Sequence, residues 1–152
     1  MQKEELIKLA KKWFEIMWSK PDLNLANEIV DPEYNPEWIL MDKKGPELLK
    51  HEIKYFRSIF PDLDYEIVDI ITEKEKIWVR YKGKGTHEGN GWGFAPTNKS
   101  MEFEGASILY ISQEGKVKDL WEAYCFYDIF ADLGVVPPFW DLHKYLSNYK
   151  KK

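Results

Sequence analysis

Apolar residues in the first part of the chain recur at the spacing of an α-helix. Within residues 3–19 they follow one another at intervals of four, three and four positions, which places them on one helical face. Pro21 ends this helix, because proline lacks a backbone donor and clashes with the preceding turn. The pattern predicts a long amphipathic helix whose buried face holds Leu6, Ala10, Trp13 and Met17.

Two further helices are expected before residue 63. Asp22 can cap a short helix over residues 23–30, because its carboxylate accepts hydrogen bonds from free backbone N–H groups. Gly45 and Pro46 open a third helix, since proline fits the first turn. Between these two helices, residues 34–42 predict a short edge strand, where a proline is tolerated because one side is unpaired. The apolar stripe of the third helix consists of Leu49, Ile53, Phe56 and Phe60.

After residue 63 the apolar residues alternate with polar ones, which is the period of β-strands. A Glu-Lys-Glu-Lys turn joins the first two strands, and a Gly-rich loop over residues 88–98 precedes the third. Helices followed by a meander of antiparallel strands favour an α+β fold with the helices on one face of the sheet. We expect the strands at residues 64–73, 76–87, 99–111 and within 115–134, where the last strand turns into a short helix.

Both faces of the last strand carry apolar bulk. A period of two places Trp121, Ala123 and Cys125 on one face, and on the other Leu120, Glu122, Tyr124 and Phe126. A strand that is apolar on both sides is covered twice, by a helical layer or a ligand on one face and by a second subunit on the other. The pattern predicts a ligand pocket under the sheet and a homodimer formed through the sheet.

The chain length bounds the domain organisation. With 152 residues the chain is long enough for one core and too short for two, so residues 1–152 are expected to form a single domain. Aromatic residues make up 16% of the chain and include seven Trp, which is typical of a ring-lined pocket or interface and equally of a Trp-rich core. The net charge of −4 gives no electrostatic reason to expect nucleic acid or an anionic membrane as partner.

Cysteine and histidine usage excludes other classes of site. The single Cys cannot form an internal disulfide. His51, His87 and His143 stand apart, without the spacing of a metal site. The amino terminus lacks the apolar segment of a secretory signal, and no run approaches the ~20 apolar residues that span a bilayer. We therefore expect a cytoplasmic protein without a metal or membrane segment.

Several short motifs occur in an order that resembles SnoaL-like polyketide cyclases, also called the ester cyclase group. This family belongs to the nuclear transport factor two-like superfamily of cone-shaped α+β barrels. Together the motifs cover about residues 45–136 and are far more specific than any one of them. They are Phe60-Pro61-Asp62, the run Gly85-Thr86-His87 followed by Gly89, Gly93, Pro96 and Thr97, the strand from Phe103 to Gly105, and Trp121 with Leu133-Gly134.

The resemblance implies a curved antiparallel sheet with N-terminal helices packed on its concave face and a pocket between them. It also implies a dimer through the sheet, no metal or organic cofactor, and in the cyclase members an Asp that acts as acid/base in an intramolecular aldol closure. One carboxyl group can do this, because burial in an apolar pocket raises its pKa toward neutrality. The implied ligand is a small hydrophobic or aromatic molecule.

This sequence departs from the family at the acid/base position. The family's Asp lies four residues after the Trp, and here that position is Cys125. Asp128 is the next carboxylate and could serve as a displaced acid or as a helix cap. Cys125 could be a nucleophile if a cation, a helix terminus or His87 lowered its pKa. A lone Cys on a strand is more often a small apolar filler, which is the interpretation we favour.

Glu104 is the first substitute for the missing acid. A two-residue turn at Glu114 and Gly115 would pair Glu104 with Cys125, whereas a three-residue loop would bring Phe103 opposite. A buried carboxylate beside a neutral thiol should have a raised pKa, and the alternative is that Glu104 lies on an exposed face. In the two-residue register, a pocket or interface face is shared by Ala106, Ile108, Tyr110, Asp119, Trp121 and Ala123.

Other candidates complete the predicted site. His87 either orients a substrate carbonyl or ties down the Gly-rich loop, and the second role is commoner for a His beside Thr and Gly. Arg80 lies in mid-strand and needs a carboxylate partner if buried, which Glu66, Glu104 or Asp119 could supply. We expect the substrate-binding walls to come from Trp13, Met17, Tyr55, Phe56, Trp92, Tyr110 and Trp121, with most of them in the core.

Three functions are compatible with this pattern. The first is an enzyme that moves a proton at a carbon next to a carbonyl of a hydrophobic substrate, using Glu104, Asp128 or His87. The second is a binding protein with the same pocket and no acid in it. The third is a subunit whose aromatic sheet face serves assembly. The Cys at the family's Asp position lowers the first and raises the second.

Overall fold

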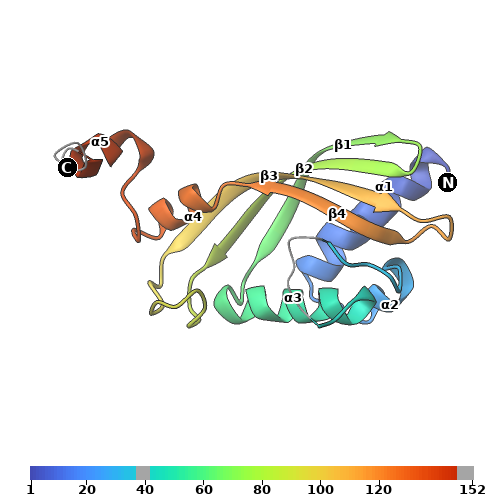
Figure 1. The fold of residues 1–152 in the computed structure, drawn as a ribbon, viewed down its shortest axis with the longest axis horizontal. Coiled ribbons are helices and arrows are strands. Elements are labelled where there is room, and N and C mark those ends of the chain that lie inside the picture. The colour runs from blue at the N-terminus through green and yellow to red at the C-terminus, as the bar shows by residue number, and fades with distance from the viewer. Residues whose placement is uncertain (37–41, 147–152) are drawn as a thin grey trace.

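The chain forms helices first and then one antiparallel sheet, in a computed structural model that describes residues 1–36 and 42–146 (Figure 1). The sheet has four strands in the order β1-β2-β3-β4, so each strand pairs with its neighbours in sequence. This meander confirms the expected α+β class, and the strand bounds match the alternating segments closely. The strands are β1 (Asp64–Glu73), β2 (Lys76–Thr86), β3 (Ser100–Ile111) and β4 (Val117–Tyr124).

The helices agree with the apolar spacing in most places. The first helix is continuous from α1 (Lys3–Lys11) into η1 (Lys12–Trp18), which is a π-helix, and the four residues of its predicted face are buried. The expected cap of α2 is wrong, because Asn24 rather than Asp22 precedes that helix. Most of the predicted edge strand at 34–42 lies outside the described residues. The other helices are α2 (Leu25–Ile29), α3 (Gly45–Ile59), α4 (Phe126–Asp132), η2 (Phe139–Asp141) and α5 (Leu142–Leu146).

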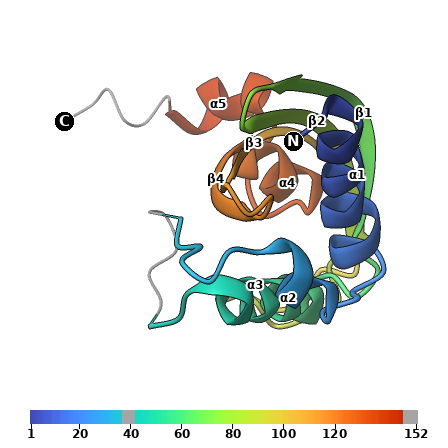
Figure 2. The ribbon, with the colours of Figure 1, turned by 90° about the vertical axis from the view of Figure 1, so that its right-hand side faces the viewer.

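The sheet curves over α1, η1, α2 and α3, which cover its concave face, whereas α5 lies beyond one end of the sheet (Figures 1 and 2). Buried and exposed residues alternate along β2, because successive side chains of a strand point to opposite faces. Tyr81 and Val79 point inward to the core, while Arg80 and Trp78 point outward. The core therefore lies between the inner face of the sheet and the helices α1, η1 and α3. None of the helices in the described ranges is long and apolar enough to cross a membrane.

The pairing of β3 with β4 decides which residues share a face. Gly105 pairs with Tyr124, and the same register continues to Tyr110 and Asp119 before it shifts at Ile111. The pairing expected for a two-residue turn is therefore found over that stretch, but the turn itself is longer, because Ser112 pairs with Lys116 and the shift at Ile111 restores the register. Trp121 and Ile108 are partners in it. The face that they share is the outer one, where Trp121 keeps 47% and Trp78 keeps 45% of the side-chain surface exposed.

Candidate functional site

A small cavity lies between α3, the inner face of the sheet and α4. Its volume is about 30 Å³, enough for a single water molecule. Of the rim residues, Phe56 and Trp92 are partly buried and Phe126 is exposed, so solvent reaches the cavity from their side. The lining combines many rings with two carboxyl groups: Trp18, Glu52, Phe56, Phe60, Leu63, Tyr65, Trp92, Met101, Phe103, Glu122, Tyr124, Phe126 and Ile129.

Glu122 is the carboxyl group that β4 contributes to this cavity. It lies between the inward-pointing Leu120 and Tyr124, opposite Ser107 of β3. The Ser107 hydroxyl donates a hydrogen bond of 2.8 Å to Oε1 of Glu122. Burial raises the pKa of Glu122 to about 7, although Ser107 and the hydroxyl of Tyr81 hold it down. A carboxyl group in this state is present in both protonated and ionised forms near neutral pH.

Glu52 is the second carboxyl group and comes from α3. Only 6% of its surface is exposed, because it lies on the helix face that also carries Leu49, Ile53 and Phe56. Its Oε2 atom is buried and has no hydrogen-bond partner among the described residues. Burial, and next the charge of Glu122, raise the pKa of Glu52 well above its usual value. The surroundings of Glu52 therefore favour its protonated, uncharged form.

The two carboxyl groups give the cavity a polar end inside aromatic walls. Burial raises the pKa of both carboxyl groups, and that of Glu122 reaches about 7. A carboxyl group whose pKa lies near the working pH can both take up and return a proton. The rings of Phe56, Trp92 and Phe126 supply apolar contact area for a hydrophobic ligand.

Of the predicted wall residues, the structure brings Phe56 and Trp92 to the cavity. Trp13 and Met17 are fully buried and belong to the core. Tyr55 is exposed and packs edge-on against Phe56. The predicted wall residues that reach the cavity thus come from the later part of α3 and from the Gly-rich loop, whereas the first helix contributes Trp18 at its end, which was not predicted.

Glu104 lies on the outer face of the sheet, away from the cavity. Its carboxylate pairs with Arg80 at 2.7 Å and with Lys82 at 3.8 Å. The hydrogen bond from Arg80 lowers the pKa of Glu104, so the expected raised pKa is wrong. The reason is the two-residue period of the strand, which places Glu104 on the same outer face as Tyr110 and Trp121. On this face Glu104 and Trp121 are exposed and Tyr110 is half-buried. The predicted partnership of Arg80 with a carboxylate is confirmed, at an exposed position.

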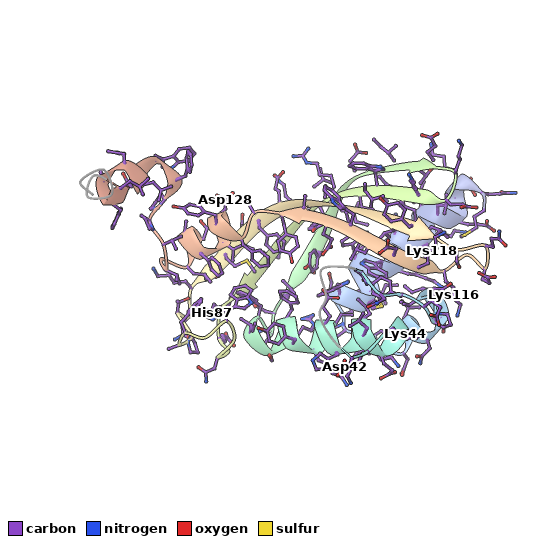
Figure 3. All side chains as sticks on the ribbon, in the orientation of Figure 1. Asp42, Lys44, His87, Lys116, Lys118 and Asp128 are labelled. Carbon is purple, nitrogen blue, oxygen red and sulfur yellow. The ribbon has the colours of Figure 1, made fainter. Side chains whose placement is uncertain are left out.

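Cys125 and Asp128 lie where β4 ends and α4 begins. Cys125 occupies the N-cap position and its side chain is exposed, so the expectation that it fills space in the core is wrong. Asp128 lies in the first turn of α4, where a negative charge favours the helix dipole. Figure 3 shows Asp128 on the outer side of this helix. Together with Glu104 it lines an open outer groove of about 540 Å³.

His87 is fully buried at the base of the Gly-rich loop. The backbone N–H of Thr97 donates to its Nδ1 atom at 3.1 Å, and its own backbone N–H donates to the carbonyl of Lys99. Asn98 returns a backbone hydrogen bond to the His87 carbonyl. These contacts close the loop, which is the second of the two expected roles. His87 is not among the residues that line the cavity.

Glu52 and Glu122 are the polar residues that the sequence interpretation missed. Both interrupt an apolar series: Glu52 falls four residues before Phe56 on the helix stripe, and Glu122 falls between Leu120 and Tyr124 on one strand face. A single charge inside an apolar series is the signal that could have identified them. In the described part of the chain, no group of three or more His, Cys, Asp or Glu side chains is placed to hold a metal ion.

Comparisons with known proteins agree with this architecture. The SnoaL-like polyketide cyclase family matches residues 8–133, and no curated protein matches the sequence. TsrD from Streptomyces laurentii has a similar structure, with a TM-score of 0.81 and 17% identity over 90% of this chain and 99% of TsrD. A candidate polyketide cyclase from Bacillus cereus gives a TM-score of 0.72 at 21% identity, over 90% of this chain and 87% of that one. AclR, a candidate hydroxylase from Streptomyces galilaeus, gives a TM-score of 0.70 at 20% identity, over 97% of this chain and 90% of AclR. At these identities the likeness shows a shared fold.

Proposed function

The chain belongs to the SnoaL-like polyketide cyclase family, and from this premise we propose that it is an enzyme acting on a small hydrophobic carbonyl compound. Glu122 takes a proton from the carbon next to the carbonyl and later returns one. The observation that carries the proposal is a carboxyl group with a pKa of about 7 in an aromatic cavity. A general acid/base is most effective when its pKa lies near the working pH.

The surroundings of Glu122 support this role. Ser107 donates to Oε1 of Glu122 at 2.8 Å, which fixes the orientation of the carboxyl group. No lysine or arginine among the described residues contributes to the pKa of Glu122. Its basicity is therefore set by burial and by two hydroxyl groups. The reaction needs only proton transfer within one substrate, so no external reactant is required.

A substrate must enlarge the cavity, which holds only about 30 Å³ in this form. The side chains that can make room are Phe56, Trp92 and Phe126, because they are partly exposed and lie at the rim. Trp92 contacts Phe126 edge-on at a ring distance of 5.9 Å. Ring rotations at this rim would admit a flat molecule between α3 and α4.

Deuterium exchange tests the proposal without knowledge of the natural substrate. A panel of cyclic aryl ketones is incubated with the protein in D₂O, and NMR follows deuterium incorporation at the carbon next to the carbonyl. We expect exchange above the buffer rate with the wild type, and a loss of about 100-fold or more with Glu122→Gln. Glu104→Gln is the matched control, because it makes the same change on the outer face. Equal exchange rates for wild type and Glu122→Gln would remove Glu122 from the mechanism.

A binding protein is the second candidate function. The observation that favours it is Cys125 at the position of the family's acid/base Asp. In this case members of the ketone panel would quench tryptophan fluorescence, since Trp92 lines the cavity, and no ketone would exchange deuterium. Binding together with exchange that depends on Glu122 would exclude this candidate.

A homodimer through the outer face of the sheet completes the proposal. The support is the pair of exposed rings of Trp78 and Trp121, whose centroids lie 6.2 Å apart, on a face that also carries charges of both signs. We expect light scattering at micromolar concentration to give twice the chain mass, and Trp121→Glu to give the mass of one chain. A wild-type protein of single-chain mass would contradict the dimer.

A further inference from the structure

The C-terminal arm, residues 135–152, carries large apolar side chains that its own chain leaves exposed. In the described part of the arm the exposed fractions are 79% for Trp140, 65% for Tyr145, 64% for Phe139 and 50% for Leu146. Tryptophan is highly buried in most proteins, and several exposed rings together mark a surface that another molecule covers. The family match ends at residue 133, so the arm is an addition to the part of the chain that the family shares.

The direction in which the arm leaves the body of the protein is fixed by contacts with α4. The hydroxyl of Tyr127 donates a hydrogen bond to the carbonyl of Pro137, and its ring packs edge-on against Phe139 with 6.5 Å between the centroids. Pro137 and Pro138 each restrict the backbone φ angle, which stiffens the connection. In both views α5 lies beyond one end of the sheet (Figures 1 and 2). The arm is therefore held away from the sheet of its own chain.

The charge of the arm is opposite to that of the remaining chain. Four lysines and Asp141 give residues 135–152 a net charge of +3. Because the whole chain carries −4, residues 1–134 carry −7. Opposite charges on two surfaces speed their encounter and fix how they meet. The arm therefore complements an acidic surface, and the rest of this chain provides one.

The outer groove beside α4 is the acidic surface nearest in character to the arm's needs. Its charged lining residues are five carboxylates and two lysines, with a net charge of −3: Asp64, Glu66, Lys82, Lys84, Glu102, Glu104 and Asp128. Asp64 and Glu104 form ion pairs within the sheet, whereas Glu66 and Glu102 take part in none of the ion pairs of the described residues. Gly83 and Phe103 complete the lining and offer apolar contact. None of the described arm residues lines this groove, so its own arm leaves it open.

We propose that the arm of one chain docks in the outer groove of a second copy of this chain, and that two copies exchange their arms in this way. The exposed rings of the arm provide the apolar contact, and its terminal lysines meet the carboxylates of Glu66 and Glu102. The groove lies on the outer face of the sheet, further along β2 from Trp78, so the docked arm extends the dimer interface of the proposed function. The inference rests on that dimer and is independent of the role of Glu122.

Sedimentation equilibrium over a series of protein concentrations gives the dissociation constant of the dimer. We expect Trp140→Ala to weaken the dimer by about 10-fold or more, because aromatic anchors dominate the binding energy of interfaces. The same change should leave the melting temperature of the dissociated chain unchanged, since Trp140 is not part of the core. Tyr55→Ala is the matched control, because it removes an exposed ring from α3, on the other side of the sheet. It should alter the dissociation constant by about 2-fold at most.

An exchange of charges tests whether the arm docks on another chain. An acidic-arm variant carries Lys150→Glu, Lys151→Glu and Lys152→Glu, and a basic-groove variant carries Glu66→Lys and Glu102→Lys. Each variant alone brings like charges together and should weaken the dimer by about 10-fold or more. An equimolar mixture should restore association, because each acidic arm then meets a basic groove and each basic arm an acidic groove. Glu66 and Glu102 are exposed, so their replacement should leave the fold intact.

The outcomes separate this inference from the proposed dimer. Failure of the mixture to associate, with both variants dissociated, would mean that the arm docks on its own chain and overturns the inference. A wild type of single-chain mass that sediments with phosphatidylglycerol vesicles through Trp140 also overturns it. A dimer that all arm and groove variants leave unchanged rejects the docked arm and retains the contact through Trp78 and Trp121. A dimer that the arm variants dissociate and Trp121→Glu does not supports the docked arm and rejects the tryptophan contact.

Discussion

Glu122 and Glu104 lie on neighbouring strands of one sheet and differ in every property that matters for chemistry. Glu122 faces inward among aromatic rings, with a serine hydroxyl as its partner, and has a pKa raised to about 7. Glu104 faces outward, pairs with Arg80, and has a lowered pKa. A glutamate side chain thus titrates near neutral pH on the inner face and stays ionised on the outer face. Burial and partner, rather than residue type, decide the difference.

The two faces of the sheet also differ in how tightly their side chains are packed. The inner face is crowded enough that an added Cβ at Gly105 would lie 2.6 Å from the hydroxyl oxygen of Tyr81. On the outer face Trp78 and Trp121 retain nearly half of their surface in solvent. Substitutions should therefore be costly inside and nearly neutral outside.

Glu122→Gln should change the pH dependence of stability. The pKa of Glu122 is higher in the folded state, so the folded protein binds more protons, and the free energy of unfolding falls as the pH rises from about 4.5 through about 7. A shift from 4.5 to about 7 corresponds to at most roughly 3.4 kcal/mol. Urea unfolding between pH 5 and 8 should show that Glu122→Gln removes part of this decline and is the more stable form at pH 8. Glu52 shifts in the same direction and leaves a residual slope.

Glu104→Gln is the control for this measurement, because its carboxylate lies on the exposed face. Its stability curve should run parallel to that of the wild type across the range. Curves of wild type and Glu122→Gln that stay parallel would show that Glu122 is not protonated on folding.

Gly105→Ala should disturb the inner face more than a change at the next residue disturbs the outer face. The new methyl group meets the ring of Tyr81 at 2.7 Å, and Tyr81 helps to set the pKa of Glu122. Overpacking of this kind costs about 1–3 kcal/mol. Ala106→Ser, one position along the strand and on the outer face, should stay within about 0.5 kcal/mol of the wild type. Thermal and urea unfolding measure both, and equal losses would contradict the contrast between the faces.

The fold could be predicted from the sequence because the spacing of apolar residues and the Gly and Pro residues that begin or end elements are local signals. Alternation over residues 64–73 predicts β1 with its bounds, and Gly45-Pro46 predicts the start of α3. The register of β3 and β4 was predicted correctly from Gly105 to Tyr110, although the turn is longer than two residues and a shift at Ile111 compensates for it. These features depend on residues close together in the chain.

The candidate site was harder to predict from the sequence, because it depends on which face of the sheet packs against the helices. The correct register placed Glu104 level with Cys125, yet a register does not say which side is inside. The better signal was a charge within an apolar series, as at Glu52 and Glu122. Which of several carboxylates is desolvated follows from contacts between α3 and β4, which are far apart in the chain.

Breaking the outer ion pair should have little effect. Arg80 and Glu104 both keep about half of their side-chain surface exposed, and water and salt screen such pairs. Arg80→Gln should therefore leave the melting temperature unchanged within experimental error at low and at high salt. A loss as large as that of Gly105→Ala would mean that the outer face is buried in solution, for example within a dimer. If a dimer buries this face, the melting temperature of the wild type should also rise with protein concentration.

Cys125 marks the end of β4, beyond which residues no longer alternate between the buried and the exposed face of the sheet. The alternation of β4 stops at Tyr124, and Cys125 is the N-cap of α4 with an exposed side chain, so it belongs to neither face. A thiol reagent should modify it in the native protein about as fast as in urea, because no burial protects it. Cys125→Ser should leave the melting temperature unchanged, since no core contact is lost. A native thiol that reacts only after unfolding would place the position of the family's acid back inside the cavity, and the role assigned to Glu122 would then need to be shared with it.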